Sequence, residues 1–390
     1  MVYKQFKDKM LSSLGFGAMR FPATAPGYGA PIEYKEATQM LEYAFENGIN
    51  YYDTSYFYHD GDSERFLGKT MARFPRDKWH IASKIPGNLM KYENGQLEVS
   101  GKKFASPLEV FEFQMDRCSV DYFDFYLLHN VSESTYGIYT NEELGIVDTL
   151  VELKAKGLVK HLGLSSHGRH DTIDAFLRYL KSRGSSDFEF CMIQLNYMDW
   201  VLQEANKKHI TITKHGLGVF VMEPLRGGSL SKLSPQATDL LVAARPLDSP
   251  SRWAFRYLQG IPNIPVILSG MSNMDQLKEN IETFSKHEPL CDSEMDILNK
   301  VRETLTDMLP CTDCKYCMEE CPVGLNIPLL LTMYDEARFE IGWYLQAAIR
   351  ALKDSEKPEA CTSCGKCAPL CPQNIDIPHM LKEFSGLLQK

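Results

Sequence analysis

Eight of the eleven cysteines in this chain of 390 residues lie in two short runs. Residues 311–322 read CTDCKYCMEECP, and residues 361–372 read CTSCGKCAPLCP. In both runs the four cysteines are separated by two, two and three residues, and a proline follows the fourth. Thiols gathered in this way in a reducing compartment bind metals or carry out redox chemistry more often than they form disulfides. The runs therefore predict a metal-binding region near the C-terminus.

The spacing C-x2-C-x2-C-x3-C-P resembles the signature of bacterial ferredoxins that hold 4Fe–4S clusters. There, three close cysteines ligate one cluster and the fourth cysteine of each run ligates the other. The alternatives are a disulfide knot or two zinc sites, although a zinc site usually uses two C-x2-C pairs with a long gap between them. The duplicated spacing therefore predicts one cluster on Cys311, Cys314, Cys317 and Cys371, and a second on Cys321, Cys361, Cys364 and Cys367.

Helical spacing fills the 39 residues between Cys321 and Cys361. Compact two-cluster ferredoxins place their runs closer together, so this arrangement resembles the helical ferredoxin domains attached to multi-subunit redox enzymes. Residues 292–310 read as a connecting helix. We therefore predict a small α-helical ferredoxin-like domain over residues 292–390. The three cysteines outside the runs are interpreted as structural: Cys118, Cys191 and Cys291.

Four residues that can hold or move a proton lie upstream, at or just after the ends of strand-like runs. Asp53 ends INYYD, Tyr58 follows it in DTSYFY, Lys84 lies near the end of HIASKI, and His129 ends FDFYLLH. A phenol is a weak acid at pH 7, and we expect the ammonium of Lys84 to lower the pKa of Tyr58. Asp53 would fix the lysine, and a neutral His129 would orient a carbonyl. Packing alone explains each residue singly, but the set predicts a general acid that protonates an oxygen as hydride reaches the carbon.

Eight strand-like runs, each followed by helical spacing, position these residues within residues 11–285. The runs are LGFGAM, INYYD, HIASKI, FDFYLLH, KHLGLSS, CMIQLNY, GVFVME and PVILSG. Eight such units indicate an α/β fold, a (β/α)8 TIM barrel, which needs about 250 residues and carries its reactive groups where the strands end. An open doubly wound sheet is the alternative, but no third glycine follows Gly15 and Gly17 in register. We therefore predict a barrel domain over residues 1–291.

Helix and loop signals agree with a barrel. Residues 34–47 carry apolar residues on one face and end before Gly48, and Asn273 can cap the last barrel helix. Two longer segments, residues 86–105 and 224–250, are expected to shape the pocket. For the second segment, a functional lid and a solvated surface excursion are equally compatible with the sequence.

These motifs together resemble the aldo-keto reductase family, in order and over most of residues 11–285. Members of that family are usually NADPH-dependent carbonyl reductases built on a (β/α)8 barrel. The resemblance implies that Tyr58 is the proton donor and that Asp53, Lys84 and His129 complete a catalytic tetrad. It also implies cofactor-binding roles on the nicotinamide and adenine for Ser165, Gln194, Met222, Glu279 and Asn280.

The chain departs from the family pattern at several of these places. Ser166 stands where the family often has asparagine, and Met222 stands where an aromatic ring often stacks on the nicotinamide. Gly270 and Gln276 appear where a lysine and an arginine usually hold the 2′-phosphate. Arginine binds phosphate through two parallel N–H groups and a positive charge, whereas glutamine has no charge. The choice between NADP(H) and NAD(H) therefore stays open.

The composition excludes several classes of protein. A formal net charge of −9 argues against a nucleic-acid binder, which normally has a basic face. No run of about 18 apolar residues occurs, so no membrane span is expected. The start, MVYKQFKDKM, lacks the apolar segment of a secretory signal. We therefore expect a cytoplasmic protein with a small-molecule substrate.

The two regions predict an oxidoreductase that uses two kinds of electron transfer. Clusters pass single electrons whereas a nicotinamide carries a hydride, and a flavin or a partner normally mediates between them. No flavin motif is recognised, although barrels can hold a flavin by their phosphate loops. A ferredoxin, flavodoxin or other redox protein is the expected partner. The alternatives are a barrel driven by a flavin or ferredoxin partner instead of nicotinamide, and clusters that serve only as a structural or docking module.

Overall fold

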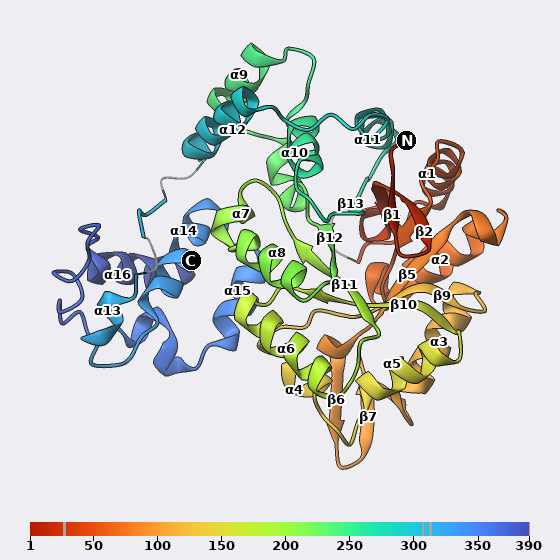
Figure 1. Ribbon diagram of the computed structural model, residues 1–390, viewed down its shortest axis with the longest axis horizontal. Helices are drawn as coiled ribbons and strands as arrows, with labels where there is room; N and C mark the ends of the chain where they lie inside the picture. Colours follow the sequence, from red (N-terminus) through yellow and green to blue (C-terminus); the bar gives the residue numbers. More distant parts are fainter. Residues whose placement is uncertain (26–28, 306–307, 312–313, 390) are drawn as a thin grey trace. The chain divides into compact units, whose positions relative to one another are not determined.

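The computed structural model describes residues 1–25, 29–305, 308–311 and 314–389. Its contacts divide the chain into two compact units (Figure 1). The first unit comprises residues 1–196, 205–232 and 249–290. The second unit comprises residues 197–204, 233–248 and 291–390.

The first unit is built on a closed barrel of eight parallel strands, which confirms the predicted fold. Around the barrel the strands follow sequence order, and the last strand pairs with the first. They are β3 (Leu14–Gly17), β4 (Tyr51–Asp53), β5 (His80–Ile85), β9 (Phe123–Leu128), β10 (Val159–Ser166), β11 (Phe188–Gln194), β12 (Gly218–Met222) and β13 (Ile267–Ser269). Because the strands are parallel, all of their C-terminal ends open at one mouth.

Helices follow the barrel strands, as the sequence predicts. They are α1 (Tyr34–Glu46), α2 (Asp62–Met71), α3 (Pro107–Cys118), α5 (Ile146–Ala155), α6 (His170–Ser182), α8 (Ala205–Lys214), α10 (Pro250–Gln259) and α11 (Met274–Thr283). Helix α1 stops before Gly48, which takes the left-handed conformation at φ 88°. At the start of α11, Asn273 accepts a hydrogen bond from the backbone N–H of Gln276, as predicted.

An N-terminal hairpin, β1 (Tyr3–Phe6) and β2 (Lys9–Ser12), precedes the barrel and was not predicted. Its Phe6 packs among the inward-facing rings of Phe125, Phe190 and Phe220. Gly218, the first residue of β12, lies against the Phe6 ring, where any β-carbon would clash. The hairpin therefore fills the end of the barrel where the strands begin, opposite to the mouth where the reactive groups gather.

Residues 86–105 fold into a small antiparallel sheet rather than an irregular loop. Its strands are β6 (Met90–Glu93), β7 (Gln96–Val99) and β8 (Lys102–Phe104). The other long segment, 224–250, contains helix α9 (Pro235–Ala244).

The second unit is mainly helical. Helix α12 (Asp292–Leu305) occupies the predicted connecting segment, of which residues 306–307 lie outside the described part of the chain. It packs on α9, and Glu294 pairs with Arg245 at 2.5 Å. The remaining helices are α7 (Asp199–Leu202), α13 (Tyr316–Glu319), α14 (Ile327–Phe339), α15 (Trp343–Ala351) and α16 (Ile377–Leu388). Helices α13 to α16 share an apolar core, which includes Leu345 of α15.

Each of the two cysteine runs is followed by a helix with the same kind of N-terminal cap. Five residues after the last cysteine of its run, Asn326 caps α14 by accepting a hydrogen bond from the N–H of Leu329. Asp376 occupies the equivalent place and caps α16. A proline stands in the first turn of each helix, where its missing N–H costs nothing. The second unit therefore contains an internal repeat, and each copy supplies four cysteines and a capped helix.

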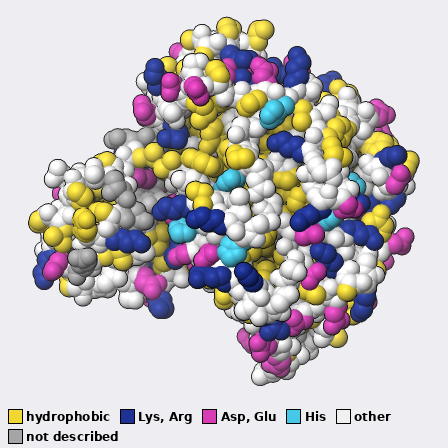
Figure 2. Space-filling model, viewed as in Figure 1, with side chains coloured by type: hydrophobic (Ala, Val, Ile, Leu, Met, Phe, Trp, Pro, Cys, Tyr) yellow, Lys and Arg dark blue, Asp and Glu magenta, His cyan; other side chains and the backbone are white. Residues whose placement is uncertain are grey.

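Acidic and basic side chains are interspersed over the barrel surface in the view of Figure 2. Within the described residues, every helix falls short of the length and apolarity that a membrane crossing demands.

Candidate functional site

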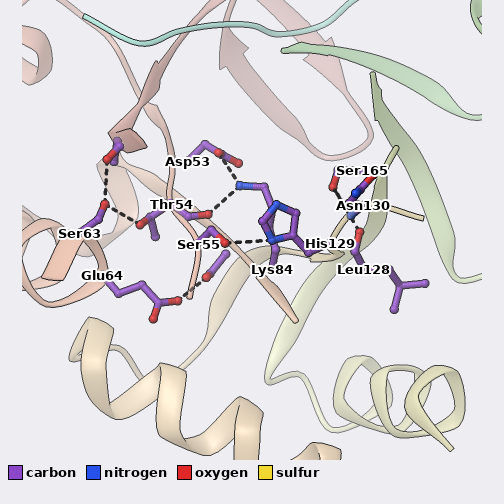
Figure 3. A network of polar contacts seen from close by, with 12 residues as sticks. Asp53, Thr54, Ser55, Ser63, Glu64, Lys84, Leu128, His129, Asn130 and Ser165 are labelled. Atoms are coloured by element: carbon purple, nitrogen blue, oxygen red, sulfur yellow. Dashed lines mark hydrogen bonds and ion pairs between the residues drawn. The ribbon is translucent and has the colours of Figure 1, made fainter. Parts of the chain in front are cut away.

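A buried ion pair joins two neighbouring strands at the mouth of the barrel. Lys84 of β5 donates to Oδ1 of Asp53 of β4 at 2.6 Å and to the carbonyl of Thr54 at 2.7 Å (Figure 3). Both side chains are nearly inaccessible to solvent. Burial raises the pKa of Asp53 and lowers that of Lys84, while their mutual attraction opposes both shifts. The ion pair between Asp53 and Lys84 is the contact through which Asp53 is predicted to fix the lysine.

Tyr58 lies in the loop that follows this pair. Its ring centroid is 5.0 Å from Nζ of Lys84, and its side chain faces a cavity. The next three residues, His59, Asp60 and Gly61, all take left-handed backbone conformations. Left-handed non-glycine residues store strain that the surroundings must hold. Tyr58 therefore occupies a tightly constrained turn.

Arg117, near the end of α3, holds this turn from the protein interior. Its guanidinium donates to the carbonyls of Tyr56 and Gly61, on either side of Tyr58. The same guanidinium pairs with the fully buried carboxylate of Glu64 at 3.1 Å. A second chain of contacts runs from Glu64 through Gln114 to the carbonyl of Lys84 at 3.1 Å. One buried network therefore braces both Tyr58 and Lys84.

The expectation that Lys84 lowers the pKa of Tyr58 is wrong. The pKa of Tyr58 lies well above its ordinary value, chiefly because the ring is buried and also because Asp53 and Glu223 are negatively charged. Lys84 faces the ring rather than the hydroxyl, and its charge is already matched by Asp53. The phenol is therefore a protonated donor throughout the neutral range.

His129 follows β9 and completes the set. Nδ1 of His129 lies 3.1 Å from the hydroxyl of Ser55 (Figure 3). Its ring stacks on Phe57, and its carbonyl accepts from Tyr139. Burial and the nearby charge of Lys84 hold its pKa well below the ordinary value, so the imidazole is neutral. In the tautomer in which Ser55 donates to Nδ1, Nε2 carries the ring hydrogen and can donate to a carbonyl oxygen.

A cavity opens at this mouth. It holds about 1000 Å³ of space open to solvent, with Asp53 and Tyr58 among its lining and Gln276 of α11 also in its wall. Residues 86–105 are absent from the described lining of this cavity, and the strands within them pair with one another as a separate sheet. Their part in shaping a substrate pocket stays a prediction. The start of segment 224–250 does line the cavity, through the glycines of the turn after β12.

The cysteines of the second unit form two groups. Each group lines a small pocket, and each takes three cysteines from one run and the last cysteine from the other. The groups are Cys311, Cys314, Cys317 and Cys371, and Cys321, Cys361, Cys364 and Cys367. The structure thus brings together the two sets that the crossed spacing predicts.

The cavity walls suit thiolates. Backbone N–H groups of Leu325 and Ser363 donate to the sulfurs of Cys321 and Cys361, each at 3.4 Å. Burial and neighbouring thiols raise the pKa of Cys317 to about 11, so a bound cation is needed to keep it ionised. Among the described residues, no three His, Cys, Asp or Glu side chains come together tightly enough to hold a single metal ion.

Comparison with known proteins identifies both units. The model of the aldo/keto reductase family matches residues 13–303. The chain belongs to this family. A 4Fe-4S dicluster domain matches residues 307–375, so the chain is an oxidoreductase of the aldo/keto reductase family with an iron–sulfur domain after the barrel.

Relatives of the barrel come from plants and bacteria. A probable aldo-keto reductase 1 of Glycine max is 27% identical over 219 residues, which are 56% of this chain and 57% of that protein. An L-galactose dehydrogenase of Arabidopsis thaliana is 23% identical over 76% of this chain and 89% of its own. The holo form of aldo-keto reductase AKR11C1 from Bacillus halodurans superposes with a TM-score of 0.58 and 25% identity, covering 77% of this chain and 96% of its own.

Two of the residues that the aldo/keto reductase resemblance assigns to the nicotinamide are buried away from the cavity wall. Ser165 accepts from the N–H of Asn130 at 2.9 Å, and Gln194 shares a hydrogen bond with His167, whose pKa burial lowers to about 3. Ser166, where the family often has asparagine, donates to the carbonyl of Val131. Contact of Ser165 and Gln194 with a carboxamide stays a prediction.

The other three assigned residues line the cavity. Met222 lies at the end of β12, Glu279 accepts from the hydroxyl of Ser249, and Asn280 donates to Ser269 at 3.0 Å. Gly270 and Gln276 line the same cavity without bringing a charge, so the departure from the aldo/keto reductase pattern is located in its wall.

Sequence reasoning missed four residues of the site. Ser55 and Arg117 support His129 and Tyr58, while Arg20 and Glu223 line the cavity after the first and seventh barrel strands. The rule that loops after barrel strands carry function could have singled out Arg20 and Glu223. No local signal marks Arg117, which reaches 61 residues back along the chain to Tyr56.

Proposed function

We propose that the barrel reduces a carbonyl with NADH or NADPH, or oxidises the alcohol in reverse, and that two 4Fe–4S clusters in residues 292–390 transfer electrons. The observation that carries the proposal is the meeting of Tyr58, the Asp53–Lys84 pair and neutral His129 beside a cavity that Asp53 and Tyr58 line. The barrel domain, residues 1–291, would hold the hydride chemistry.

Two side chains, His129 and Tyr58, donate to the carbonyl oxygen of the substrate. His129 donates from Nε2 and fixes the oxygen beside the Tyr58 hydroxyl. Tyr58 gives its proton to that oxygen as negative charge develops on it. Lys84 then stabilises the resulting phenolate from the face of the ring, and Asp53 keeps the ammonium in place.

Atoms and electrons balance in this scheme. When bound, the reduced nicotinamide supplies a hydride, which carries two electrons to the carbonyl carbon. The Tyr58 proton converts the oxygen to a hydroxyl, and Tyr58 recovers a proton from solvent through the open cavity. Alcohol oxidation runs the same proton back to Tyr58, with NAD(P)+ as the oxidant.

The raised pKa of Tyr58 keeps the phenol protonated at neutral pH, which is the form that carbonyl reduction requires. The same shift makes the phenol a weaker acid, so it gives up its proton only as the carbonyl oxygen gains negative charge. The carboxylate of Glu223, which faces the same cavity, is one cause of the shift.

For the clusters, the support is the convergence of four thiols on each of two cavities and the match to a dicluster domain. Electron exchange with a ferredoxin, a flavodoxin or another redox protein would let single electrons enter or leave the chain. Thiolate clusters also suit a reducing compartment, and we place the protein in the cytoplasm on that ground.

Protein from which the clusters have been removed tests whether the clusters transfer electrons to the substrate. NADH- and NADPH-dependent reduction of a panel of small aldehydes and ketones is compared with reduction driven by dithionite-reduced ferredoxin, before and after cluster loss. Such a transfer predicts that ferredoxin-driven turnover needs the clusters. If turnover is the same in protein without clusters, the clusters serve as a structural or docking module. If turnover occurs with reduced ferredoxin but with neither NADH nor NADPH, a partner protein or a flavin supplies the electrons instead of nicotinamide.

A further inference from the structure

We propose that Ser55 is a positioning residue for His129: its hydroxyl group holds the ring hydrogen of the imidazole on Nε2, and this makes the barrel mouth select a substrate oxygen that only accepts hydrogen bonds. The inference rests on the proposed function, because it names the residue that sets the direction of one hydrogen bond to the carbonyl oxygen. Ser55 lies in the loop after β4, and His129 directly follows β9. Figure 3 shows the contact between the two side chains.

The first step of the argument concerns the hydrogen of the Ser55 hydroxyl. The Ser55 side chain is fully buried. Among the described residues, Nδ1 of His129, at 3.1 Å, is the one hydrogen-bond partner of its Oγ. The hydroxyl can therefore use its hydrogen only by donating to Nδ1, which accepts only when it carries no hydrogen itself. In a neutral imidazole the ring hydrogen is then on Nε2.

The opposite tautomer would leave a buried donor without an acceptor. Nδ1 would then donate to Oγ of Ser55, and the hydroxyl hydrogen would have no acceptor among the described residues. A buried donor left in this state is disfavoured by a factor of roughly 5 to 100. A doubly protonated ring is disfavoured as well, because burial and the charge of Lys84 hold the pKa of His129 well below its ordinary value.

The surroundings of His129 fix the plane of its ring but not the places of the two ring nitrogens. The ring stacks on Phe57 with centroids 5.0 Å apart and planes 11° from parallel. The backbone is held by Ile85, whose carbonyl accepts from the N–H of His129 at 3.0 Å, and by Tyr139, whose hydroxyl donates to the carbonyl at 2.6 Å. A half-turn of the imidazole would keep these contacts and would put a C–H group against Ser55. The hydrogen bond from Ser55 therefore selects the ring orientation as well as the tautomer.

Nε2 of His129 is the ring atom that this arrangement leaves for a substrate. It has no hydrogen-bond partner among the described residues, and it is not sealed from solvent. The ring of Tyr58 lies across the same imidazole, with its centroid 6.3 Å away and its plane at 85°. An Nε2–H group beside Tyr58 gives the mouth two donors for one oxygen, whereas a bare Nε2 would direct a lone pair at that oxygen.

The hydrogen on Nε2 distinguishes between the carbonyl compound and the alcohol of the proposed reaction. A carbonyl oxygen only accepts hydrogen bonds, whereas an alcohol hydroxyl both donates and accepts. An alcohol can therefore bind either tautomer of His129, but an aldehyde or ketone needs the Nε2–H form. We expect Ser55 to contribute to ground-state binding of the carbonyl compound and little to that of the alcohol. Because both directions share one transition state, Ser55 should contribute equally to kcat/KM in both.

Nuclear magnetic resonance of cluster-loaded, oxidised protein with 15N in its histidine rings measures the tautomer without any substrate. The nitrogen that carries hydrogen and the bare nitrogen give separate signals, and His129→Gln identifies those of His129. The wild-type protein should show hydrogen on Nε2. In Ser55→Ala, a water molecule that replaces the hydroxyl can donate or accept, so both tautomers should appear. Ser55→Thr keeps the hydroxyl and should keep the Nε2–H form.

Steady-state kinetics give a second readout, with the aldehyde that the wild-type protein reduces fastest and the corresponding primary alcohol. Ser55→Ala should lower kcat/KM in both directions by a similar factor, about 3- to 30-fold, which is the usual contribution of one hydrogen bond. KM should rise for the aldehyde and stay within about twofold of the wild-type value for the alcohol. Ser55→Thr should recover most of the loss in kcat/KM.

Ser63→Ala is the matched control, because it removes another fully buried hydroxyl close to the same loop. The Ser63 hydroxyl bonds Oγ1 of Thr54 and the carbonyl of Ala18, each at 2.9 Å, and does not contact His129 (Figure 3). Its loss should lower the thermal unfolding temperature, and should leave the tautomer of His129 and both KM values unchanged. A merely structural role of Ser55 would make the two alanine variants behave alike.

The outcomes separate the inference from the proposed function. Hydrogen on Nδ1 of His129 in the wild-type protein, or an unchanged Nε2–H form in Ser55→Ala, would overturn the inference and leave carbonyl reduction standing. Equal increases in KM for aldehyde and alcohol in Ser55→Ala would overturn the claim that Ser55 selects an accepting oxygen. If the wild-type protein reduces no aldehyde with either nucleotide, the proposed function fails, and the spectrum of His129 still decides whether Ser55 sets the tautomer.

Discussion

The reactive groups of the barrel and the thiols of the second unit are held in different ways. At the barrel mouth, Asp53, Lys84 and His129 come from separate strands and are fixed by buried protein contacts. In the second unit the eight thiols come from two local runs and line two small cavities. The barrel site is therefore preorganised by protein packing, whereas the second unit depends on whatever its thiols bind.

This difference has a consequence for folding. The core of the second unit includes two of the proposed cluster ligands, Cys317 and Cys367, both nearly buried. Binding energy of a group that bridges the two runs is then folding energy for this unit. The core inside the barrel consists of apolar and aromatic side chains and includes no proposed ligand.

The largest expected effect comes from breaking one thiol set. Cys317→Ser should abolish one cluster and reduce the iron content from about eight to about four atoms per chain, since each 4Fe–4S cluster needs all of its thiolates. Iron analysis and electron paramagnetic resonance of the reduced protein measure both changes. Cys291→Ser, which alters an exposed cysteine outside both cavities, is the control and should leave the iron content unchanged. An iron content that stays at about eight atoms per chain in Cys317→Ser would contradict the two-cluster assignment.

A large effect on rate alone is expected at Tyr58. Tyr58→Phe removes the proton donor while keeping the ring against Lys84, and should lower kcat about 100- to 10,000-fold. The thermal unfolding temperature should stay close to that of the wild type, because the hydroxyl has no hydrogen-bond partner among the described residues. Retention of more than a tenth of the wild-type kcat would remove Tyr58 from the mechanism.

The buried ion pair should respond in stability as well as rate. Lys84→Met leaves the Asp53 carboxylate buried and unpaired, and should cost about 3–5 kcal/mol in the free energy of barrel unfolding. The double variant Asp53→Asn, Lys84→Met should recover much of that stability without recovering activity. Chemical denaturation and steady-state assays on the three proteins distinguish these effects. Full stability of Lys84→Met would show that the pair is not held as the structure has it.

The smallest expected effect is a flat pH profile. The pKa of His129 lies well below its ordinary value of 6.5, and that of Tyr58 lies well above 10.0. His129 therefore stays neutral, and Tyr58 stays protonated, between about pH 6 and pH 10. We expect kcat/KM for carbonyl reduction to show no ionisation of either group in this interval. An alkaline decline near pH 8 that disappears in Tyr58→Phe would show that the phenol is more acidic than its burial implies.

How much the sequence predicts also differs between the two regions. The crossed cysteine sets follow from local spacing, and the structure groups the same residues. The convergence of Asp53, Lys84 and His129 follows from the rule that parallel strands end at one mouth. The pKa of Tyr58 could not be predicted, because it depends on how deeply the ring is buried and on which face Lys84 approaches.

Long-range supports were equally invisible to sequence patterns. Arg117 braces the Tyr58 turn from a helix that begins some fifty residues later in the chain. The first β-hairpin was missed because its strands, YKQF and KMLS, are too short and too polar to give a clear alternation.

The central claim is that hydride reaches a carbonyl in the barrel, next to Tyr58. Its most direct test is a single anaerobic turnover of wild-type protein with NADH or NADPH deuterated on one face of C4, in separate experiments for each face, and a small aldehyde. We predict that mass spectrometry finds deuterium on the carbinol carbon of the product for one face of one nucleotide, and that Tyr58→Phe slows this transfer without redirecting it. Alcohol formed without deuterium from either face, with electrons supplied by the clusters, would contradict the account.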